Sequence, residues 1–379
     1  MAKLTIQSLL QTHLEAYLQN HKLAQYQYKA LRAMRNCRTA KLGGHSVYCE
    51  NGHLHGIWYN SCKHRNCPQC HGIASERWQL KLNELMLNTT HHHWVFTIPH
   101  DLLPLWRYNR ALFQQLLFKC VSDTIKKLSS DNKYLGASPG YLLALHTWAR
   151  NLVLHPHIHC LITHGGLSSD NQWVTPKRTV FLPAKVMMAI FRGKLLDGLR
   201  KSAKRGELIL PPDSPPQQTL NLCNKLGRTD WVLHCCDPYK YGTSVAKYLG
   251  RYIKGGAVRN SQLLNMNNDT VLFRYQSHQT KHTEYLKLDV EHFIGRIINH
   301  ISVPRLMSLR RFGLYHSAGR KVLNHARVHF KQSAVTPAQE LNWNEYLASK
   351  SQIPCCQYCQ GKLVSLIRRS ARELILATV

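Results

Sequence analysis

The chain has 379 residues, and 50 Lys or Arg against 20 Asp or Glu give it a formal net charge of +30. Such a chain is attracted to polyanions, above all nucleic acid. No stretch approaches the ~18 consecutive apolar residues of a membrane span, and polar residues interrupt the N-terminus where a signal peptide needs an apolar core. We therefore expect a cytoplasmic protein. Without a G-x4-GK[ST] motif there is no sequence basis for an ATPase or helicase.

The N-terminal region is predicted to be helical on both sides of a cysteine-rich segment. Residues 4–36 carry apolar side chains at helical spacing between basic residues, which predicts one or two amphipathic helices. A further helix is expected at 75–87. Between 37 and 70 the periodicity gives way to Gly, Cys and His.

Five of the 13 cysteines lie in that segment, and a reducing cytosol makes metal ligands a better reading than disulfides. The stretch SCKHRNCPQC has the spacing C-x4-C-x2-C, and zinc takes four thiolate or imidazole ligands. One set of four thiolates is Cys49, Cys62, Cys67 and Cys70. The residues that could fill a second site or exchange into the first are Cys37, His45, His53 and His64. The C-terminal CCQYC supplies Cys355, Cys356 and Cys359 without a matching second pair, so a metal there stays open.

After residue 90 the pattern predicts strands and helices of a second domain. We expect a strand in HHHWVFTIPH, a helix at 105–128, a hairpin at 141–162, a helix in TSVAKYLGRYIKGG, a second hairpin from VLFRY to TEYLKL and a helix in EHFIGRIINHI. The predicted fold class is α+β, with an antiparallel sheet flanked by helices after a helix-rich zinc-binding domain. The predicted domains are residues 1–90, residues 91–335, and a C-terminal tail over 336–379.

The stretch LHPHIHCLITHGG places His155, His157 and His159 on alternate residues, so a strand would point all three to one face. A turn at Asn151 and Leu152 would pair residues whose numbers sum to 303, which sets His146 opposite His157 on that face. A lone strand histidine is usually a hydrogen-bonded core or surface residue. Four on one face favour a metal site instead, with His155 the one that could act as an outer partner of a ligand.

Tyr248 and Tyr252 are four residues apart in the predicted helix and share one of its faces. They could form a packing stripe. Lys247, Arg251 and Lys254 make the same helix cationic, which suits a surface that binds DNA phosphates. A phenol has a pKa near ~10 and needs a metal or a base to act as a nucleophile.

These features together resemble the HUH endonucleases, and in particular the two-tyrosine insertion-sequence transposases that move by rolling circle. The similar segments include SCKHRNCPQC, FTIPHDLLP, HTWARNLVLHPHIHCLITHGGL, YLGRY and EHFIGRIINHISVPRLMSLRRFGLYHS, and the likeness covers most of the chain. Where many members have C-x2-C, this chain has Cys49-x3-His53.

The resemblance implies an HUH-type sheet, a Mg²⁺ or Mn²⁺ ion on His157 and His159, and Tyr248 and Tyr252 as nucleophiles that cut single-stranded DNA. Cleavage would leave a 5′-phosphotyrosine and a free 3′-OH. Related relaxases complete the metal site with a third histidine, a role that the hairpin register gives to His146. The implied partners are the DNA ends of the protein's own element and a target DNA, at the nucleoid of a prokaryote.

Two other functions would also use these residues. A plasmid replication initiator or relaxase would use the same chemistry, but the N-terminal cysteine cluster argues against it. A zinc-dependent DNA-binding regulator without catalysis would use the tyrosines for packing and the histidines as structural residues. Nicking of single strands on addition of Mg²⁺ or Mn²⁺ separates the catalytic readings from the regulator.

Overall fold

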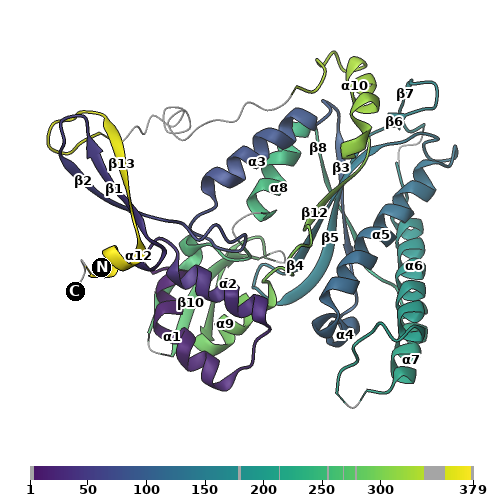
Figure 1. Cartoon of the computed structure of the whole chain (residues 1–379). Helices are drawn as coiled ribbons and strands as arrows, with labels where there is room; N and C mark the ends of the chain where they lie inside the picture. Colours follow the sequence, from purple (N-terminus) through teal and green to yellow (C-terminus); the bar gives the residue numbers. More distant parts are fainter. Residues whose placement is uncertain are drawn as a thin grey trace.

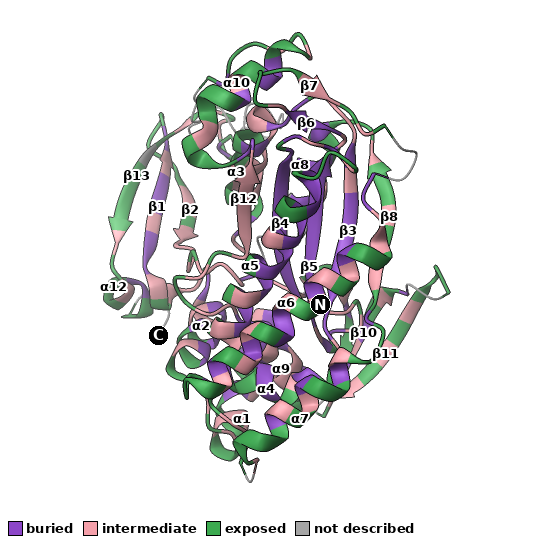
Figure 2. Ribbon diagram, turned by 90° about the vertical axis from the view of Figure 1, so that its right-hand side faces the viewer, coloured by how far each residue is buried: buried purple, intermediate pink, exposed green. Residues whose placement is uncertain are grey.

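A five-stranded antiparallel sheet forms the centre of the computed structural model (Figure 1). The structure describes residues 4–177, 181–212, 214–253, 256–267, 269–277, 280–336 and 355–376. The strands lie in the order β12 (Leu309–Gly313), β4 (Gly140–Trp148), β5 (Leu154–Thr163), β3 (His91–Thr97) and β8 (Leu233–Tyr239). The three central strands are the most buried part of the sheet (Figure 2). With its flanking helices, this sheet confirms the predicted α+β class.

One face of the central sheet packs against helices from the middle of the chain. These are α4 (Leu103–Tyr108), α5 (Arg110–Ser129), α6 (Ala184–Lys204) and α7 (Pro216–Gly227). Alternate strand residues such as Phe96 and Ile158 meet Phe113 and Phe191 in one fully buried core. Burial of each such side chain contributes about 1.5–3 kcal/mol relative to exposure.

The other face of the sheet is covered by α3 (Gly72–Leu85), α8 (Gly242–Ile253) and α10 (Arg320–Val328). Val245 and Leu249 of α8 pack with Ala144 and Leu161 of the sheet. Helix α8 begins at Gly242, where an added Cβ would lie 2.6 Å from the Met86 Cβ. Only glycine permits that close approach, so this residue fixes where α8 crosses the sheet.

A third unit joins the two N-terminal helices to a later part of the chain. Its elements are α1 (Ile6–Asn20), α2 (Gln25–Asn36), the 3-10 helix η3 (Asn260–Gln262), β9 (Leu263–Met266), β10 (Thr270–Gln276), β11 (Thr283–Asp289) and α9 (Val290–Asn299). Leu9 and Leu10 share a core with Phe273 and Phe293. Leu9 and Leu10 of α1 are therefore packed on residues that follow them by more than 260 positions.

A three-stranded sheet stands apart from the centre and joins a strand near the C-terminus to two strands of the cysteine-rich region (Figure 1). The central strand β1 (Gly44–Cys49) pairs with β2 (Leu54–Tyr59) and with β13 (Leu363–Arg369), which comes from the predicted C-terminal tail. The remaining elements are small: η1 (Ala40–Leu42), η2 (His100–Leu102), β6 (Gly166–Leu167), β7 (Trp173–Val174), η4 (Ser317–Gly319) and α12 (Ala371–Leu376).

The predicted helices and both hairpins are present, with one difference in the helix expected at 105–128. It is divided into α4 and α5 at Asn109, whose side-chain amide donates to the carbonyls of Leu105 and Ile209 at 2.9 and 2.7 Å. Asparagine side chains compete with helical backbone bonds in this way, which ends one helix and starts another. Among the described residues, no helix has the length and apolar character needed to cross a bilayer.

Candidate metal and nuclease site

The hairpin of β4 and β5 brings three histidines together under helix α8. The strands pair from Tyr141 with Ile162 to His146 with His157, which confirms the predicted register over these residues. The turn itself differs from the predicted one: the Leu152 N–H donates to the Ala149 carbonyl and the Ala149 N–H donates to the Val153 carbonyl, so three residues, 150–152, form the turn. A register shift follows, so Trp148 pairs with Leu154 and not with His155 as predicted. The ligand nitrogens of His146, His157 and His159 lie within 4.8 Å of one another. We call these three residues the three-histidine cluster; His155 is outside it.

Hydrogen bonding fixes how His157 presents its ring. Its Nδ1 lies 2.6 Å from the carbonyl oxygen of His155 and must therefore carry the proton that is donated. The Nε2 atom then holds a lone pair, and it lies 3.0 Å from the Nε2 of His159. Two imidazole nitrogens directed at one point are typical of a metal site whose ligand tautomers are set by outer partners.

Burial favours the neutral, metal-binding form of His146. All three histidines are buried, and desolvation together with the neighbouring His157 and His93 holds the pKa of His146 well below its usual range. Three buried imidazoles whose ligand atoms lie within 4.8 Å of one another form a donor set for a divalent cation, so the residues present fit an ion here.

His93 is a further member of the site that sequence reasoning missed. It lies on β3 with its Nε2 2.8 Å from the Nδ1 of His159, on the side of that ring away from His157. Burial lowers the pKa of His93 to about 4. The neutral His93 ring thus orients His159 from behind, as outer partners of metal ligands do. The alternation of side chains along HHHWVF is the one sequence signal for this residue. It does not reveal which of the histidines lies on the same face of the sheet as the three-histidine cluster.

Helix α8 places Tyr248 at the cluster. The Tyr248 hydroxyl lies 3.2 Å from the Nδ1 of His159, and its ring is 5.2 Å from that of His93. Tyr252 lies one helical turn further along α8, and its side chain is outside the described part of the structure. Lys247 is exposed; the Arg251 side chain and Lys254 also fall outside the described residues.

Seven of the cysteines and one histidine form two clusters, and the members of each differ from the predicted ligand sets. The first cysteine cluster consists of Cys37, Cys62, Cys67 and Cys70. Cys37, and not Cys49, supplies its fourth sulfur, because α2 ends at Asn36 and leaves Cys37 next to the loop of Cys62, whose N–H is 3.4 Å from the Cys37 sulfur. Hydrogen bonding to the other three sulfurs raises the pKa of Cys67 far above its usual range, and the Cys37 sulfur makes the largest contribution.

The second cysteine cluster consists of Cys49, His53, Cys356 and Cys359. It joins β1 to the C-terminal segment, which the sequence could not pair with any other cysteines. Two of the predicted alternatives lie outside both clusters. His45 is half-buried in β1, and His64 accepts a hydrogen bond from the Asn66 backbone at 3.3 Å. Cys355 is exposed and bonds to Gln360 instead.

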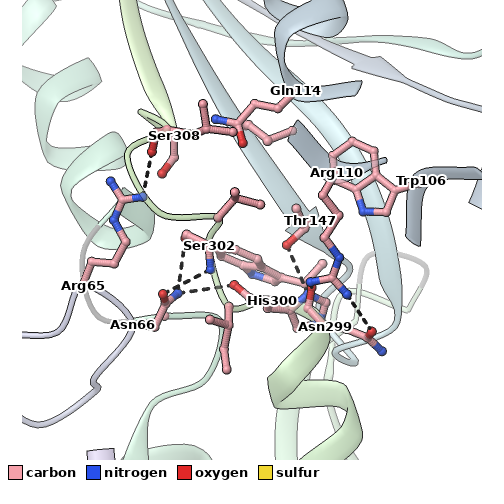
Figure 3. A pocket seen from close by; sticks show the side chains of 16 residues that line it. Arg65, Asn66, Trp106, Arg110, Gln114, Thr147, Asn299, His300, Ser302 and Ser308 are labelled. Atoms are coloured by element: carbon pink, nitrogen blue, oxygen red, sulfur yellow. Dashed lines mark hydrogen bonds between the residues drawn. The ribbon is translucent and has the colours of Figure 1, made fainter. Parts of the chain in front are cut away.

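The loop of the first cysteine cluster is fixed against the strand that carries His146. It borders a cavity of about 50 Å³ between β4 and the segment after α9 (Figure 3). The Asn66 amide donates to the His300 carbonyl at 3.3 Å, and Arg65 donates to the Leu306 carbonyl at 2.7 Å. Trp148 lines the cavity, with its ring 5.1 Å from that of His146 and 5.7 Å from that of His300. The cysteine loop and the three-histidine cluster are thus parts of one packed unit.

Two family models match the chain. Residues 9–98 match one described as "Transposase zinc-binding domain", and residues 140–322 match one described as "Putative transposase". The first range contains the complete first cysteine cluster, and the second contains the three-histidine cluster and α8.

Curated relatives extend the likeness over nearly the whole chain. It is 30% identical to "Putative transposase y4qJ" of Sinorhizobium fredii over 368 residues, which are 93% of this chain and 92% of that protein. It is 28% identical to the transposase for insertion sequence element IS801 of Pseudomonas savastanoi pv. phaseolicola over 312 residues, 78% of this chain and 72% of that protein.

Among solved structures, two of the conjugative relaxase TrwC are similar. One, in complex with a 27-mer DNA, is 14% identical over 42% of this chain and 71% of the relaxase chain. The other, a metal-free complex with oriT DNA, is 15% identical over 42% of this chain and 70% of the relaxase chain. The TM-score is 0.23 in both cases.

The zinc-binding domain, followed by a histidine-lined sheet with a tyrosine-bearing helix, defines a class of DNA transposases. Within that class, the chain belongs to the IS91 family of rolling-circle transposases of insertion sequences.

Proposed function

We propose that this transposase nicks and rejoins single-stranded DNA at the ends of its insertion sequence through a 5′-phosphotyrosine, with Tyr248 as the first nucleophile. The observation that carries the proposal is the Tyr248 hydroxyl lying 3.2 Å from a nitrogen of His159, in a cluster of buried histidines. The hydroxyl meets His159 at Nδ1, the nitrogen that His93 also contacts, so Tyr248 lies directly beside a ring of the cluster. Membership of the transposase family supports the same reaction.

The three-histidine cluster would hold a Mg²⁺ or Mn²⁺ ion. The ion supplies positive charge beside the phosphate oxygens where negative charge develops. The protein's own contribution is orientation: the carbonyl of His155 sets the ring of His157, and His93 sets the ring of His159. These contacts hold the nitrogens in place before DNA arrives.

In the cleavage step, the Tyr248 oxygen attacks the scissile phosphorus and the bond from phosphorus to the 3′ oxygen breaks. The phenol proton passes to water, and the departing oxygen takes up a proton to become the 3′-OH. The phosphodiester energy is conserved in the new ester, so the DNA can be rejoined without ATP. The product is a 5′-phosphotyrosine on α8.

Tyr252 is the proposed second nucleophile. One turn of helix separates it from Tyr248, so both phenols would work at the same cluster. Strand transfer needs a second group, because the first tyrosine stays esterified until its link is resolved. The replacement of either by Phe should therefore block complete transposition, and the double replacement should abolish the covalent adduct.

DNA binding is assigned to the positive charge of the whole chain, which includes Lys247, Arg251 and Lys254 next to the two tyrosines in the sequence. A net charge of +30 attracts single and double strands without sequence preference. The proposed partners are the ends of the protein's own element and a target DNA, and we expect the protein to act at the nucleoid. The first cysteine cluster is the proposed structural zinc site, because four sulfurs within 4.8 Å match a closed tetrahedral ligand set.

The test uses labelled single-stranded DNA from an element end, titrated with Mg²⁺ and Mn²⁺. His157→Ala should lower nicking by at least about 1000-fold, since it removes an ion that stabilises the transition state. DNA binding should stay within about twofold because it depends on spread charge. His155→Ala is the matched control, because it alters the same strand outside the cluster and should keep nicking. Normal cleavage by His157→Ala at all ion concentrations would refute the metal assignment.

A further inference from the structure

The C-terminal segment folds back onto the N-terminal cysteine region through two kinds of contact. Strand β13 pairs with β1 from Gly44 opposite Arg369 to Cys49 opposite Leu363 (Figure 1). The Glu50 N–H also donates to the Lys362 carbonyl at 3.0 Å. These bonds bring the tight turn at 355–362 against the turn that joins β1 to β2.

Four potential ligands meet at that point with distances typical of a metal site. The Cys49 sulfur lies 3.7 Å from the Cys359 sulfur and 3.5 Å from His53 Nδ1, and the Cys356 sulfur lies 3.8 Å from the same nitrogen. A tetrahedral zinc ion with Zn–S near ~2.3 Å and Zn–N near ~2.05 Å separates its sulfurs by about 3.8 Å and a sulfur and nitrogen by about 3.5 Å. A disulfide would need its sulfurs at ~2.05 Å.

Backbone and side-chain N–H groups around the cluster favour thiolates. The His53 N–H donates to the Cys49 sulfur at 3.3 Å, and the Asn51 amide donates to the Cys359 sulfur at 3.3 Å. The turns that carry these donors and sulfurs contain left-handed residues, Gly52 at φ 80° and Gln360 at φ 58°. Each turn thus presents two ligands, Cys49 with His53 and Cys356 with Cys359, in the manner of a pair of zinc knuckles.

We propose that Cys49, His53, Cys356 and Cys359 bind a second structural zinc ion, separate from the first cysteine cluster. Its role is to fasten the C-terminal strand to the N-terminal sheet. That sheet has little core of its own, because Val364, Leu366 and Ile367 of β13 are 61%, 59% and 46% exposed. A small unit with so little buried surface takes its stability from a metal. The inference does not rest on the nuclease chemistry.

The test begins with zinc content, measured by native mass spectrometry on the full chain purified without chelators. The wild-type chain should carry two zinc ions, and Cys356→Ser with Cys359→Ser should carry one. Cys355→Ser is the matched control, since this exposed neighbour lies outside the cluster, and it should keep two. A double variant that keeps the full zinc content of the wild type would overturn the proposal, whatever the occupancy of the first cysteine cluster.

Two measurements remain informative should the double variant fail to fold. Zinc X-ray absorption on the wild type should show seven sulfurs and one nitrogen shared over two ions. Alkylation of the native wild type should modify Cys355 at once, and Cys356 and Cys359 only after a chelator is added. An all-sulfur environment for every bound zinc, or modification of Cys359 unaffected by the chelator, would equally overturn it.

Discussion

His300 makes the stability of the protein sensitive to acid in a way that can be calculated from its surroundings. It is buried, with Nε2 donating to the Leu152 carbonyl at 3.0 Å and Nδ1 accepting from the Thr147 hydroxyl at 3.1 Å. Burial lowers its pKa from 6.5 to about 4. Between these two pKa values the unfolded chain binds a proton at His300 that the folded chain does not bind. The contribution of His300 to the free energy of unfolding is therefore fully present above pH 6.5 and decreases as the pH falls toward 4.

The size of the effect follows from the shift. At about 1.4 kcal/mol per pKa unit, His300 accounts for about 3 kcal/mol in full and about 2 kcal/mol at pH 5. His300→Gln should be less stable than wild type at pH 8, because it loses ring packing against Trp148. The difference in unfolding free energy between the two proteins should be smaller by about 2 kcal/mol at pH 5, because only the wild type has a buried histidine at this position whose protonation favours the unfolded chain.

Urea unfolding followed by tryptophan fluorescence at pH 8 and pH 5 measures this difference. Loss of zinc in acid destabilises both proteins alike and cancels in the comparison. Thr147→Val is the control, since it removes one hydrogen bond but leaves the buried ring, so its stability should run parallel to wild type over the pH range. A difference between His300→Gln and wild type that stays constant from pH 8 to pH 5 would refute the reasoning.

Three further predictions concern the three-histidine cluster, the first cysteine cluster and the core of the third unit, which holds α1 and α2. His93→Ala should weaken Mn²⁺ binding by about 10–100-fold because His159 loses the partner at its Nδ1, and calorimetric titration showing unchanged affinity would dismiss that role. Cys67→Ser should lose one zinc ion by elemental analysis, whereas Cys160→Ser, a buried thiol in the sheet, should lose none; equal zinc content in both would count against the first cysteine cluster as a site. Phe273→Ala should cost about 3–5 kcal/mol of unfolding free energy, and a loss below 1 kcal/mol would show that the third core is loosely packed.

The local features of the site could be predicted because they depend on neighbouring residues. A short turn around Asn151 joins the two strands of the hairpin, and the pleat puts His146, His157 and His159 on one face. The pairing holds as predicted up to His157, and it departs only where the ladder is irregular next to Trp148.

The features that could not be predicted all depend on contacts between distant segments. His93 faces the cluster because β3 pairs with β5 in a register that aligns Val95 with His159, and no short-range pattern encodes that pairing. The choice between Cys37 and Cys49 as the fourth sulfur is likewise set by where α2 ends and by β13 pairing with β1. A C-x2-C spacing identifies two ligands of an ion but carries no information about the other two.

The most direct test of the central claim maps the covalent DNA link on the wild-type protein. After reaction with a single-stranded element end and nuclease trimming, trypsin should cut after Lys247, Arg251 and Lys254, which places Tyr248 and Tyr252 in separate peptides, YLGR and YIK. Mass spectrometry should find the first-strand adduct on YLGR, and Tyr248→Phe should remove it from that peptide. An adduct on YIK alone would contradict the order given to the two tyrosines. A covalent adduct on neither peptide would contradict the claim that α8 carries the nucleophile.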